Sequence, residues 1–161
     1  IFTMRADGSR KELVSTGKGR CTCSFFTPDG KSIVLSSTHE RNEGPQAPLD
    51  MSKGYVWMIN PDYQIYRTPT DVKPGEKRTW TRLTDLPGKY AAETTISPDG
   101  KYMVWTTDKD GDLEIYRSNL DGGDVRRLTD EVGYDGGPFV SWDGKTIAYR
   151  RDAFQSPGAI E

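Results

Sequence analysis

Ser97-Pro98-Asp99-Gly100 has two slightly altered copies elsewhere in this chain. It returns 44 residues later as Ser141-Trp142-Asp143-Gly144, and an earlier copy is Thr27-Pro28-Asp29-Gly30. In such a turn, Asp bonds its own backbone and Gly takes the positive φ that a tight hairpin needs. Repeats of about 40–45 residues built from short strands are typical of β-propeller blades, so the recurring turn predicts a propeller.

Two further sequence motifs, which we call landmarks, recur at nearly constant distances from this turn. The first is an isoleucine followed by an aromatic residue, found at Ile1-Phe2, Ile65-Tyr66 and Ile115-Tyr116. The second is Arg-Leu-Thr-Asp at residues 82–85 and 127–130, with residues 13–15 as a weaker copy. The spacing from this second landmark to the Asp of the next turn is nearly constant in all three copies. Three landmarks in register indicate a true internal repeat.

Each repeat is expected to form four short strands. In the clearest copy we expect them at Thr94–Ser97, Tyr102–Thr107, Leu113–Ser118 and Val125–Leu128. In the last, incomplete copy we expect the first two strands at Phe139–Val140 and Thr146–Tyr149. These segments are rich in Val, Ile, Tyr, Trp and Thr, which suit a half-buried pleated surface. Apolar residues keep no helical period in any window, so the sequence predicts an all-β protein with helix as a minor component at most.

The chain is expected to hold about three four-stranded antiparallel blades of a larger ring. Residues 1–19 are expected to form the outer strands of a first blade, and residues 20–87 a second blade with insertions at 38–53 and 69–77. A third blade is expected at 88–131 and the inner strands of the next blade at 132–151. Residues 152–161 are expected to form a tail or the start of an insertion. A closed ring has roughly four to eight blades. Either the chain is a segment of a longer one, which we favour, or copies of it join to close a ring.

The composition excludes several classes of protein. The 161 residues include 22 basic and 24 acidic side chains, interspersed along the chain, for a net charge of −2. Nucleic-acid binding normally requires a concentrated basic footprint, so we expect no nucleic-acid partner. Apolar residues make up 34% of the chain, and no run of them is long enough to span a bilayer. No signal peptide is recognisable at Ile1, where the chain begins without Met and inside a predicted strand.

Two sets of residues are candidates for binding. The first insertion is rich in Glu, Asn, Gly and Pro, and long loops on a rigid scaffold often carry function; a solvated loop without function is the alternative. Tyr55–Ile59, which follows it, is expected to add an apolar strand or to lengthen a hairpin. Glu93 and Asp135 are expected just before inner strands, near the end of the ring's channel. The candidate binding residues are Glu40, Arg41, Asn42, Glu43, Glu93 and Asp135.

Cys21 and Cys23 stand two residues apart in a predicted strand. Side chains at i and i+2 share one face of a strand, and a disulfide across that spacing would be strained. A structural zinc site needs two more Cys or His ligands, and His39 is the only histidine. We expect two buried free thiols; a redox or metal role, or pairing with a group outside this chain, are the alternatives.

Asp108, Asp110 and Asp112 alternate as the ligands of a calcium loop do, because hard cations take six to eight oxygens. The EF-hand pattern fails, since its sixth and twelfth positions are Leu113 and Asn119. A hairpin turn explains the stretch more simply, so we expect no cofactor and keep calcium as the weaker alternative. The chain has no Gly-x-Ser-x-Gly segment and no Gly-rich phosphate loop, and we therefore predict no catalytic residue.

These motifs together resemble the TolB-like β-propeller repeat, a relative of WD-type repeats. The resemblance is carried by Ser-Pro-Asp-Gly-Lys at 97–101, Asp-Gly-Asp-Leu-Glu-Ile-Tyr at 110–116 and Arg-Leu-Thr-Asp at 127–130. It covers residues 88–151 and 1–37, and the insertions interrupt it between 38 and 80. The sequence departs from the family pattern at Trp142, which replaces the usual Pro, and at Thr16–Arg20.

The resemblance implies a six- to eight-bladed bacterial propeller in the periplasm or outside the cell, a non-enzymatic scaffold that binds a protein or peptide. Related repeats also form the substrate-gating propeller of prolyl-oligopeptidase-like serine peptidases, which is one alternative. Another is a self-assembling component of the envelope or of a filament, because unpaired edge strands favour pairing. The remaining blades would come from the same chain or from another copy.

Overall fold

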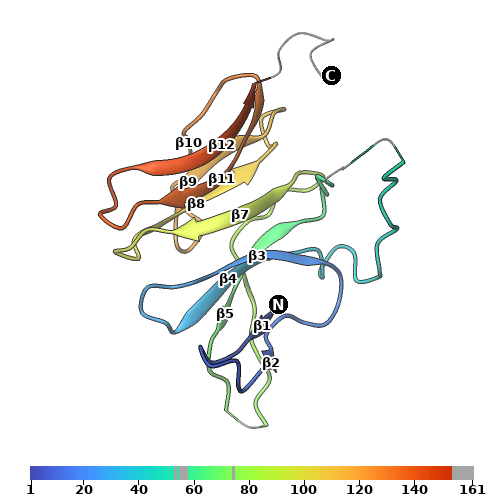
Figure 1. The fold of residues 1–161 in the computed structure, drawn as a ribbon, viewed down its shortest axis with the longest axis vertical. Helices are drawn as coiled ribbons and strands as arrows, with labels where there is room; N and C mark the ends of the chain where they lie inside the picture. Colours follow the sequence, from blue (N-terminus) through green and yellow to red (C-terminus); the bar gives the residue numbers. More distant parts are fainter. Residues whose placement is uncertain (53, 55–57, 74, 154–161) are drawn as a thin grey trace.

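The computed structural model describes residues 1–52, 54, 58–73 and 75–153 (Figure 1). These residues form strands, turns and loops without a helix, so none of them lies in a helix that could cross a bilayer. The strands in chain order are β1 (Phe2–Thr3), β2 (Glu12–Leu13), β3 (Cys21–Phe26), β4 (Ser32–Ser37), β5 (Gln64–Pro69), β6 (Thr81–Arg82), β7 (Ala91–Ile96), β8 (Tyr102–Thr107), β9 (Glu114–Asn119), β10 (Arg126–Arg127), β11 (Gly133–Val140) and β12 (Ile147–Ala153).

The strands form four separate antiparallel sheets. β3 to β6 make one four-stranded sheet in chain order, and β7 to β10 make another. β1–β2 and β11–β12 are two-stranded. The sheets follow one another like the ribs of a fan, from β1–β2 at the bottom of Figure 1 to β11–β12 at the top. This arrangement confirms the predicted fold class, an all-β protein made of partial propeller blades.

The first strands of successive sheets, β3, β7 and β11, are termed the inner strands. Two of them start earlier than the sequence predicts: β7 at Ala91 and β11 at Gly133, where Thr94 and Phe139 were expected. The reason is a β-bulge in each strand, which breaks the alternation of side chains that the prediction relied on. Glu93 and Asp135 therefore lie inside inner strands, and the prediction that they precede them is wrong.

The recurring turn owes its shape to its own side chains. Ser97 Oγ donates to Asp99 Oδ1 at 2.7 Å and accepts a hydrogen bond from Tyr102 N at 3.1 Å. Asp99 Oδ1 also accepts from Lys101 N, and these hydrogen bonds hold the pKa of Asp99 below its usual value. Gly100 has a φ of 68°, which favours glycine. The turns at Asp29 and Asp143 repeat the same contacts, so the motif recurs because each hairpin needs all of it.

The main core lies where the two four-stranded sheets face each other. Trp105 is fully buried there, its ring centroid 5.6 Å from that of Tyr116, and its Nε1 donates to Ser118 Oγ at 3.1 Å. Leu83 from the preceding sheet packs into the same cluster. Burial of this large aromatic side chain between sheets makes it a main contributor to stability.

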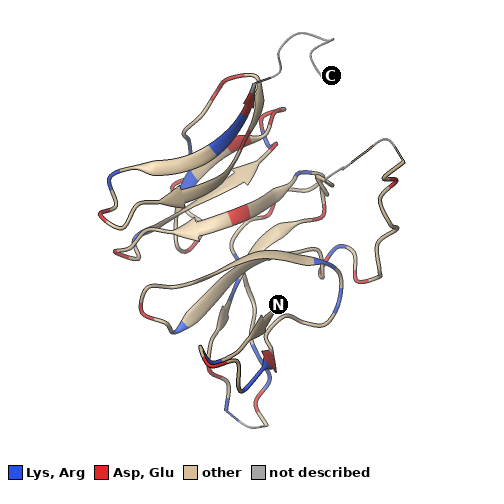
Figure 2. Ribbon diagram, in the orientation of Figure 1, with Lys and Arg blue, Asp and Glu red and all other residues tan. Residues whose placement is uncertain are grey.

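Basic and acidic residues are scattered over the described ribbon, in turns, at strand ends and within β7 and β12, as Figure 2 shows. The predicted extra strand at Tyr55–Ile59 falls partly on residues 55–57, which lie outside the described residues, while Met58 and Ile59 belong to no strand.

Candidate functional site

Each inner strand carries its bulge at the same place. One residue at each bulge has a positive φ: Cys23 at 46°, Glu93 at 59° and Gly137 at 60°. Each lies six residues before the Asp of the turn that follows. Glycine adopts this backbone freely, whereas Cys and Glu do so at a cost in strain. Strain of this kind clusters at functional sites, which directs attention to the bulges.

The three bulge residues line one cavity of about 390 Å³. A second cavity of about 530 Å³ shares Ser24, Phe25 and Phe139 with the first. We name the combined lining the inner-strand surface, since nearly all of it comes from β3, β7 and β11 and the turns that follow them. Its residues are Cys23, Ser24, Phe25, Phe26, Thr27, Pro28, Glu93, Thr94, Thr95, Ile96, Pro98, Tyr134, Gly137, Pro138, Phe139, Val140, Trp142 and Arg150.

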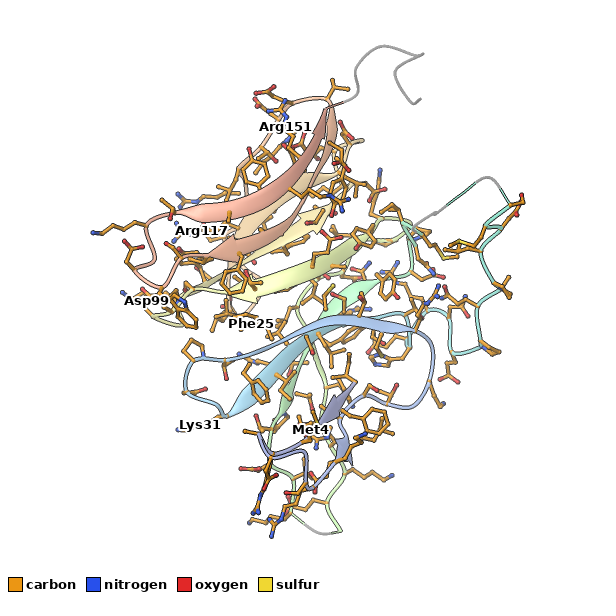
Figure 3. All side chains as sticks on the ribbon, in the orientation of Figure 1. Met4, Phe25, Lys31, Asp99, Arg117 and Arg151 are labelled. Atoms are coloured by element: carbon orange, nitrogen blue, oxygen red, sulfur yellow. The ribbon has the colours of Figure 1, made fainter. Side chains whose placement is uncertain are left out.

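Aromatic side chains dominate the inner-strand surface. Phe25 points from β3 toward β7 in Figure 3, and its ring meets that of Phe139 edge to face at 5.9 Å between centroids. Phe26 and Phe139 are half exposed, and Trp142 is 84% exposed. At the other end of the surface, the guanidinium of Arg150 lies 4.6 Å from the centroid of the Tyr134 ring. The inner-strand surface is therefore a mainly apolar hollow with one cationic side chain, Arg150, in its lining.

Glu93 holds this surface together. Its Oε1 accepts a hydrogen bond from Tyr90 Oη at 2.9 Å. Its Oε2 accepts from Thr106 Oγ1 at 2.9 Å, from Tyr134 Oη at 2.8 Å and from Gly137 N at 2.6 Å. The buried carboxylate therefore joins β7 to β8 and β11, and it fixes both the Tyr134 ring and the Gly137 bulge. Its position makes Glu93 a positioning residue of the surface.

Two ionisable neighbours of Glu93, Tyr134 and Cys23, have shifted pKa values. Burial raises the pKa of Tyr134 above its usual value, and the charge of Glu93 adds to the effect. Cys23 is exposed and also lines the cavity, and desolvation, with the charge of Glu93 adding to it, raises the pKa of its thiol. A thiol with a raised pKa is a poor nucleophile at neutral pH.

The cysteine prediction is wrong on burial. Cys21 is only half-buried, with its sulfur 3.3 Å from Ser37 Oγ, and Cys23 is exposed. The bulge at Cys23 breaks the i and i+2 alternation that was assumed for the two side chains. Both are free thiols.

Asp135 lies apart from the inner-strand surface, because it lines neither cavity. Its side chain is buried, with Oδ1 3.9 Å from Arg151 Nε and with Oδ2 lacking a hydrogen-bond partner. Burial raises the pKa of this carboxyl, and the positive charge of Arg151 opposes the rise. The structure therefore does not bring Asp135 and Glu93 together in one site.

Asp135 should leave a signature in the pH dependence of stability. A raised pKa in the folded state gives stability that is present at low pH and is lost as pH rises through that pKa. Asp135→Asn removes this titration while keeping the side chain's shape. We expect the free energy of unfolding of wild type minus variant, from urea melts, to fall as the pH rises above the ordinary aspartate pKa of about 4.

Asp143→Asn is the matched control with the opposite sign. Hydrogen bonds from Ser141 Oγ and Lys145 N lower the pKa of Asp143, so its contribution is present at neutral pH and is lost on acidification. The same difference should therefore rise with pH for this variant. Two curves that run parallel would contradict the assignment of Asp135.

The four candidate binding residues of the first insertion, residues 40–43, contact other side chains of this chain. Glu40 Oε2 lies 3.2 Å from Arg82 Nη1 and accepts from Tyr66 Oη, and Arg41 Nη2 pairs with Asp85 at 2.7 Å. The remaining contacts are Lys18–Glu43 at 2.8 Å and Asn42–Asp62 at 3.5 Å. None of the four lines the inner-strand surface, so the structure separates them from Glu93.

The three calcium candidates each hold a different part of the protein. Asp108 accepts from Tyr90 N at 2.7 Å, Asp110 pairs with Lys109 at 2.9 Å, and Asp112 accepts from Gly133 N at 2.8 Å. In the part of the chain that the structure describes, no three His, Cys, Asp or Glu side chains are grouped to hold a metal ion. Calcium binding stays an untested alternative to the predicted absence of a cofactor.

Comparison of sequences identifies the relatives of this chain. No family model matches it. An uncharacterised protein of Agrobacterium fabrum is 32% identical over 84 residues, which are 50% of this chain and 28% of that protein. The Tol-Pal system protein TolB of Francisella tularensis is 28% identical over 119 residues, which are 71% of this chain and 27% of its own length.

Solved structures agree with the sequence relatives. A putative TolB from Agrobacterium tumefaciens matches with a TM-score of 0.70 at 22% identity, over 97% of this chain and 48% of that one. TolB from Acinetobacter baumannii matches with a TM-score of 0.61 at 24% identity, over 96% of this chain and 32% of that one. In sequence and in fold, the chain is similar to TolB-like β-propeller proteins. This TolB-like chain spans less than a third of the length of the two curated relatives.

The TolB-like fold is shared with hydrolases. Puromycin hydrolase matches with a TM-score of 0.55 at 16% identity, over 81% of the TolB-like chain and 18% of the enzyme. At that identity the likeness concerns the fold alone.

Sequence reasoning missed most of the TolB-like chain's inner-strand surface. Tyr134, Gly137 and Phe139 were not candidates, although Gly137 stands at the same distance from its turn as Glu93 does. Aligning the three turns would have placed Cys23, Glu93 and Gly137 in one row.

Proposed function

We propose that this chain is part of a TolB-like propeller in the bacterial periplasm that binds a protein or peptide on its inner-strand surface. The observation that carries the proposal is the pair of adjoining cavities. They are lined by exposed aromatic side chains, and a hydrogen bond from Gly137 N to Glu93 fixes part of the lining. Aromatic residues are enriched where proteins bind partners, because they bury a large area with little loss of conformational freedom. The name of the Francisella relative, a Tol-Pal system protein, supports an envelope role.

An enzymatic role for this part of the protein has less support. His39 Nδ1 lies 2.9 Å from Ser37 Oγ, but Ser37 is buried. The His39 ring packs against those of Tyr66 and Trp80, and burial lowers its pKa. A substrate could not reach this serine without opening the core, so the pair is structural. The peptidase alternative thus depends on other parts of a longer protein.

Peptide binding tests the proposal directly. Peptides recovered from a random phage-displayed library on the immobilised chain would be titrated into wild type by calorimetry. We expect Trp142→Ala to weaken the recovered peptides about tenfold or more, because it removes a large exposed contact without disturbing the core.

The matched control is Met51→Ala, which removes an exposed apolar side chain from the first insertion. Affinity should be unchanged in this variant. If Met51→Ala weakens binding and Trp142→Ala does not, the insertion is the binding site and the proposal for the inner-strand surface is wrong.

A further inference from the structure

Two buried carboxylates lie at the junction between the sheet β7–β10 and the sheet β11–β12. Asp135 in β11 and Glu114 in β9 are each 1% exposed. Asp135 N donates to the backbone oxygen of Leu113 at 2.8 Å, and this hydrogen bond brings β11 against the start of β9. Among the described residues, Asp135 Oδ2 and Glu114 Oε2 are both buried without a hydrogen-bond partner. A buried oxygen that lacks a donor is costly, so this pair requires an explanation.

The other oxygen of each carboxylate faces an arginine. Glu114 Oε1 accepts a hydrogen bond from Arg127 Nη2 at 2.6 Å, whereas Asp135 Oδ1 lies 3.9 Å from Arg151 Nε. Arg151, which Figure 3 labels, also pairs with Glu131. The closer arginine stabilises a negative charge better on Glu114 than on Asp135. With every carboxyl ionised, this cluster would hold three negative and two positive side chains, and one proton would make it neutral.

The equivalent position in the preceding sheet shows what this place in the fold requires. Gln64 and Glu114 both directly precede the isoleucine-aromatic landmark, and both are buried. Gln64 Nε2 donates to the backbone oxygens of Leu86 and Lys89 at 3.1 Å each, and its Oε1 accepts from Leu86 N at 2.9 Å. The amide therefore acts as donor and acceptor at once. An ionised carboxylate can only accept, so a pair of carboxyls needs a proton to supply the missing donor.

We propose that Asp135 is protonated in the folded protein and that its Oδ2 donates this proton to Glu114 Oε2. One proton then satisfies both unpartnered oxygens and neutralises the cluster. The junction between the sheets β7–β10 and β11–β12 is therefore a pH-sensitive contact, tight while Asp135 keeps the proton and weakened when the proton is lost. At the preceding junction Gln64 and Ala91 stand in the equivalent places, and neither side chain titrates.

The groups around Asp135 support placing the proton there. Burial raises the pKa of Asp135, and the charges of Glu114 and Glu131 act in the same direction. The charge of Arg151 and a hydrogen bond from the Thr129 side chain oppose the rise. Two negative neighbours and a dry surrounding thus act against ionisation of this carboxyl.

The titration of the Asp135 carboxyl carbon, followed by nuclear magnetic resonance, tests this proposal, which does not depend on peptide binding. In wild type the midpoint should lie above the ordinary aspartate value of about 4. Glu114→Gln should lower the midpoint by about one pH unit or more, because the amide donates to ionised Asp135 and the charge of Glu114 is gone. Asp130→Asn is the control: it removes an exposed carboxylate from the loop before β11 and should leave the midpoint unchanged.

Urea unfolding tests the same proton by its effect on stability. Asp135→Asn carries a permanent donor for Glu114 Oε2, so above the wild-type midpoint this variant should unfold at a higher urea concentration than wild type. Asp135→Ala leaves that oxygen without a donor and should unfold at a lower urea concentration at every pH. A wild-type midpoint at or below about 4 would overturn the proposal. So would a shift in Glu114→Gln no larger than in Asp130→Asn, or an Asp135→Asn variant less stable than wild type at every pH.

Discussion

Glu93→Ala is expected to lower the free energy of unfolding by about 3–5 kcal/mol. The wild-type carboxylate is buried and accepts four hydrogen bonds, from Tyr90, Thr106, Tyr134 and Gly137. Removing it leaves these donors without their shared acceptor, and a buried donor that loses its partner costs more than the average hydrogen bond contributes. Urea unfolding followed by tryptophan fluorescence gives the value.

Glu93→Gln separates hydrogen bonding from packing at the same site. Its shape is nearly unchanged: the amide oxygen can accept from Thr106, Tyr134 and Gly137, and the amide NH2 can donate to Tyr90 Oη. We expect a loss of about 1–2 kcal/mol, because hydrogen bonds to a charged acceptor are stronger than those to a neutral one. If Ala and Gln cost the same, the carboxylate does not hold β7 to β11 as the structure indicates.

Trp105→Ala should have a cost of similar size, about 3–5 kcal/mol. The side chain is fully buried between sheets, and its ring and Nε1 contact Tyr116 and Ser118. Replacement by Ala removes that contact area and leaves a cavity in the main core, which the rigid sheets around it can collapse only in part. Chemical denaturation at equilibrium measures the loss.

Trp142→Ala is the matched substitution on the surface. Because Trp142 is 84% exposed, we expect its free energy of unfolding to stay within about 0.5 kcal/mol of wild type. The same variant is expected to lose peptide affinity. Trp105 is therefore expected to contribute to stability, and Trp142 to binding. Equal destabilisation by both substitutions would mean that Trp142 packs into the fold.

The sheets could be predicted from the sequence because their signals are local. Ser97, Asp99 and Gly100 bond to one another and to backbone within a few residues, so the turn can be read without knowing the fold. The aromatic residues at 66 and 116 likewise mark a strand wherever the repeat returns. Because the sequence unit repeats, equivalent strands of successive sheets are expected to pack in equivalent ways, and this predicts how the sheets are arranged.

The candidate site could not be predicted in the same way because its contacts are distant in sequence. Glu93 meets Tyr134 and Gly137 across two sheets, and no local pattern indicates that pairing. The bulges also interrupt the period of two, which is why the starts of β7 and β11 were placed too late and Asp135 was taken for a channel residue. Positive φ at Cys23 and Glu93 leaves no trace in residue type, since only Gly137 carries the residue that such a backbone favours.

The convergence of the inner strands on one surface is tested most directly by nuclear Overhauser effects between the rings of Phe25 and Phe139. The rings belong to β3 and β11, the inner strands of sheets that are not neighbours in the chain, and their centroids are 5.9 Å apart. We expect a clear cross-peak between their ring protons. With both rings assigned, its absence, together with cross-peaks joining Phe25 to strands other than β3, β4, β7 and β11, would contradict a fan of blades around one inner surface.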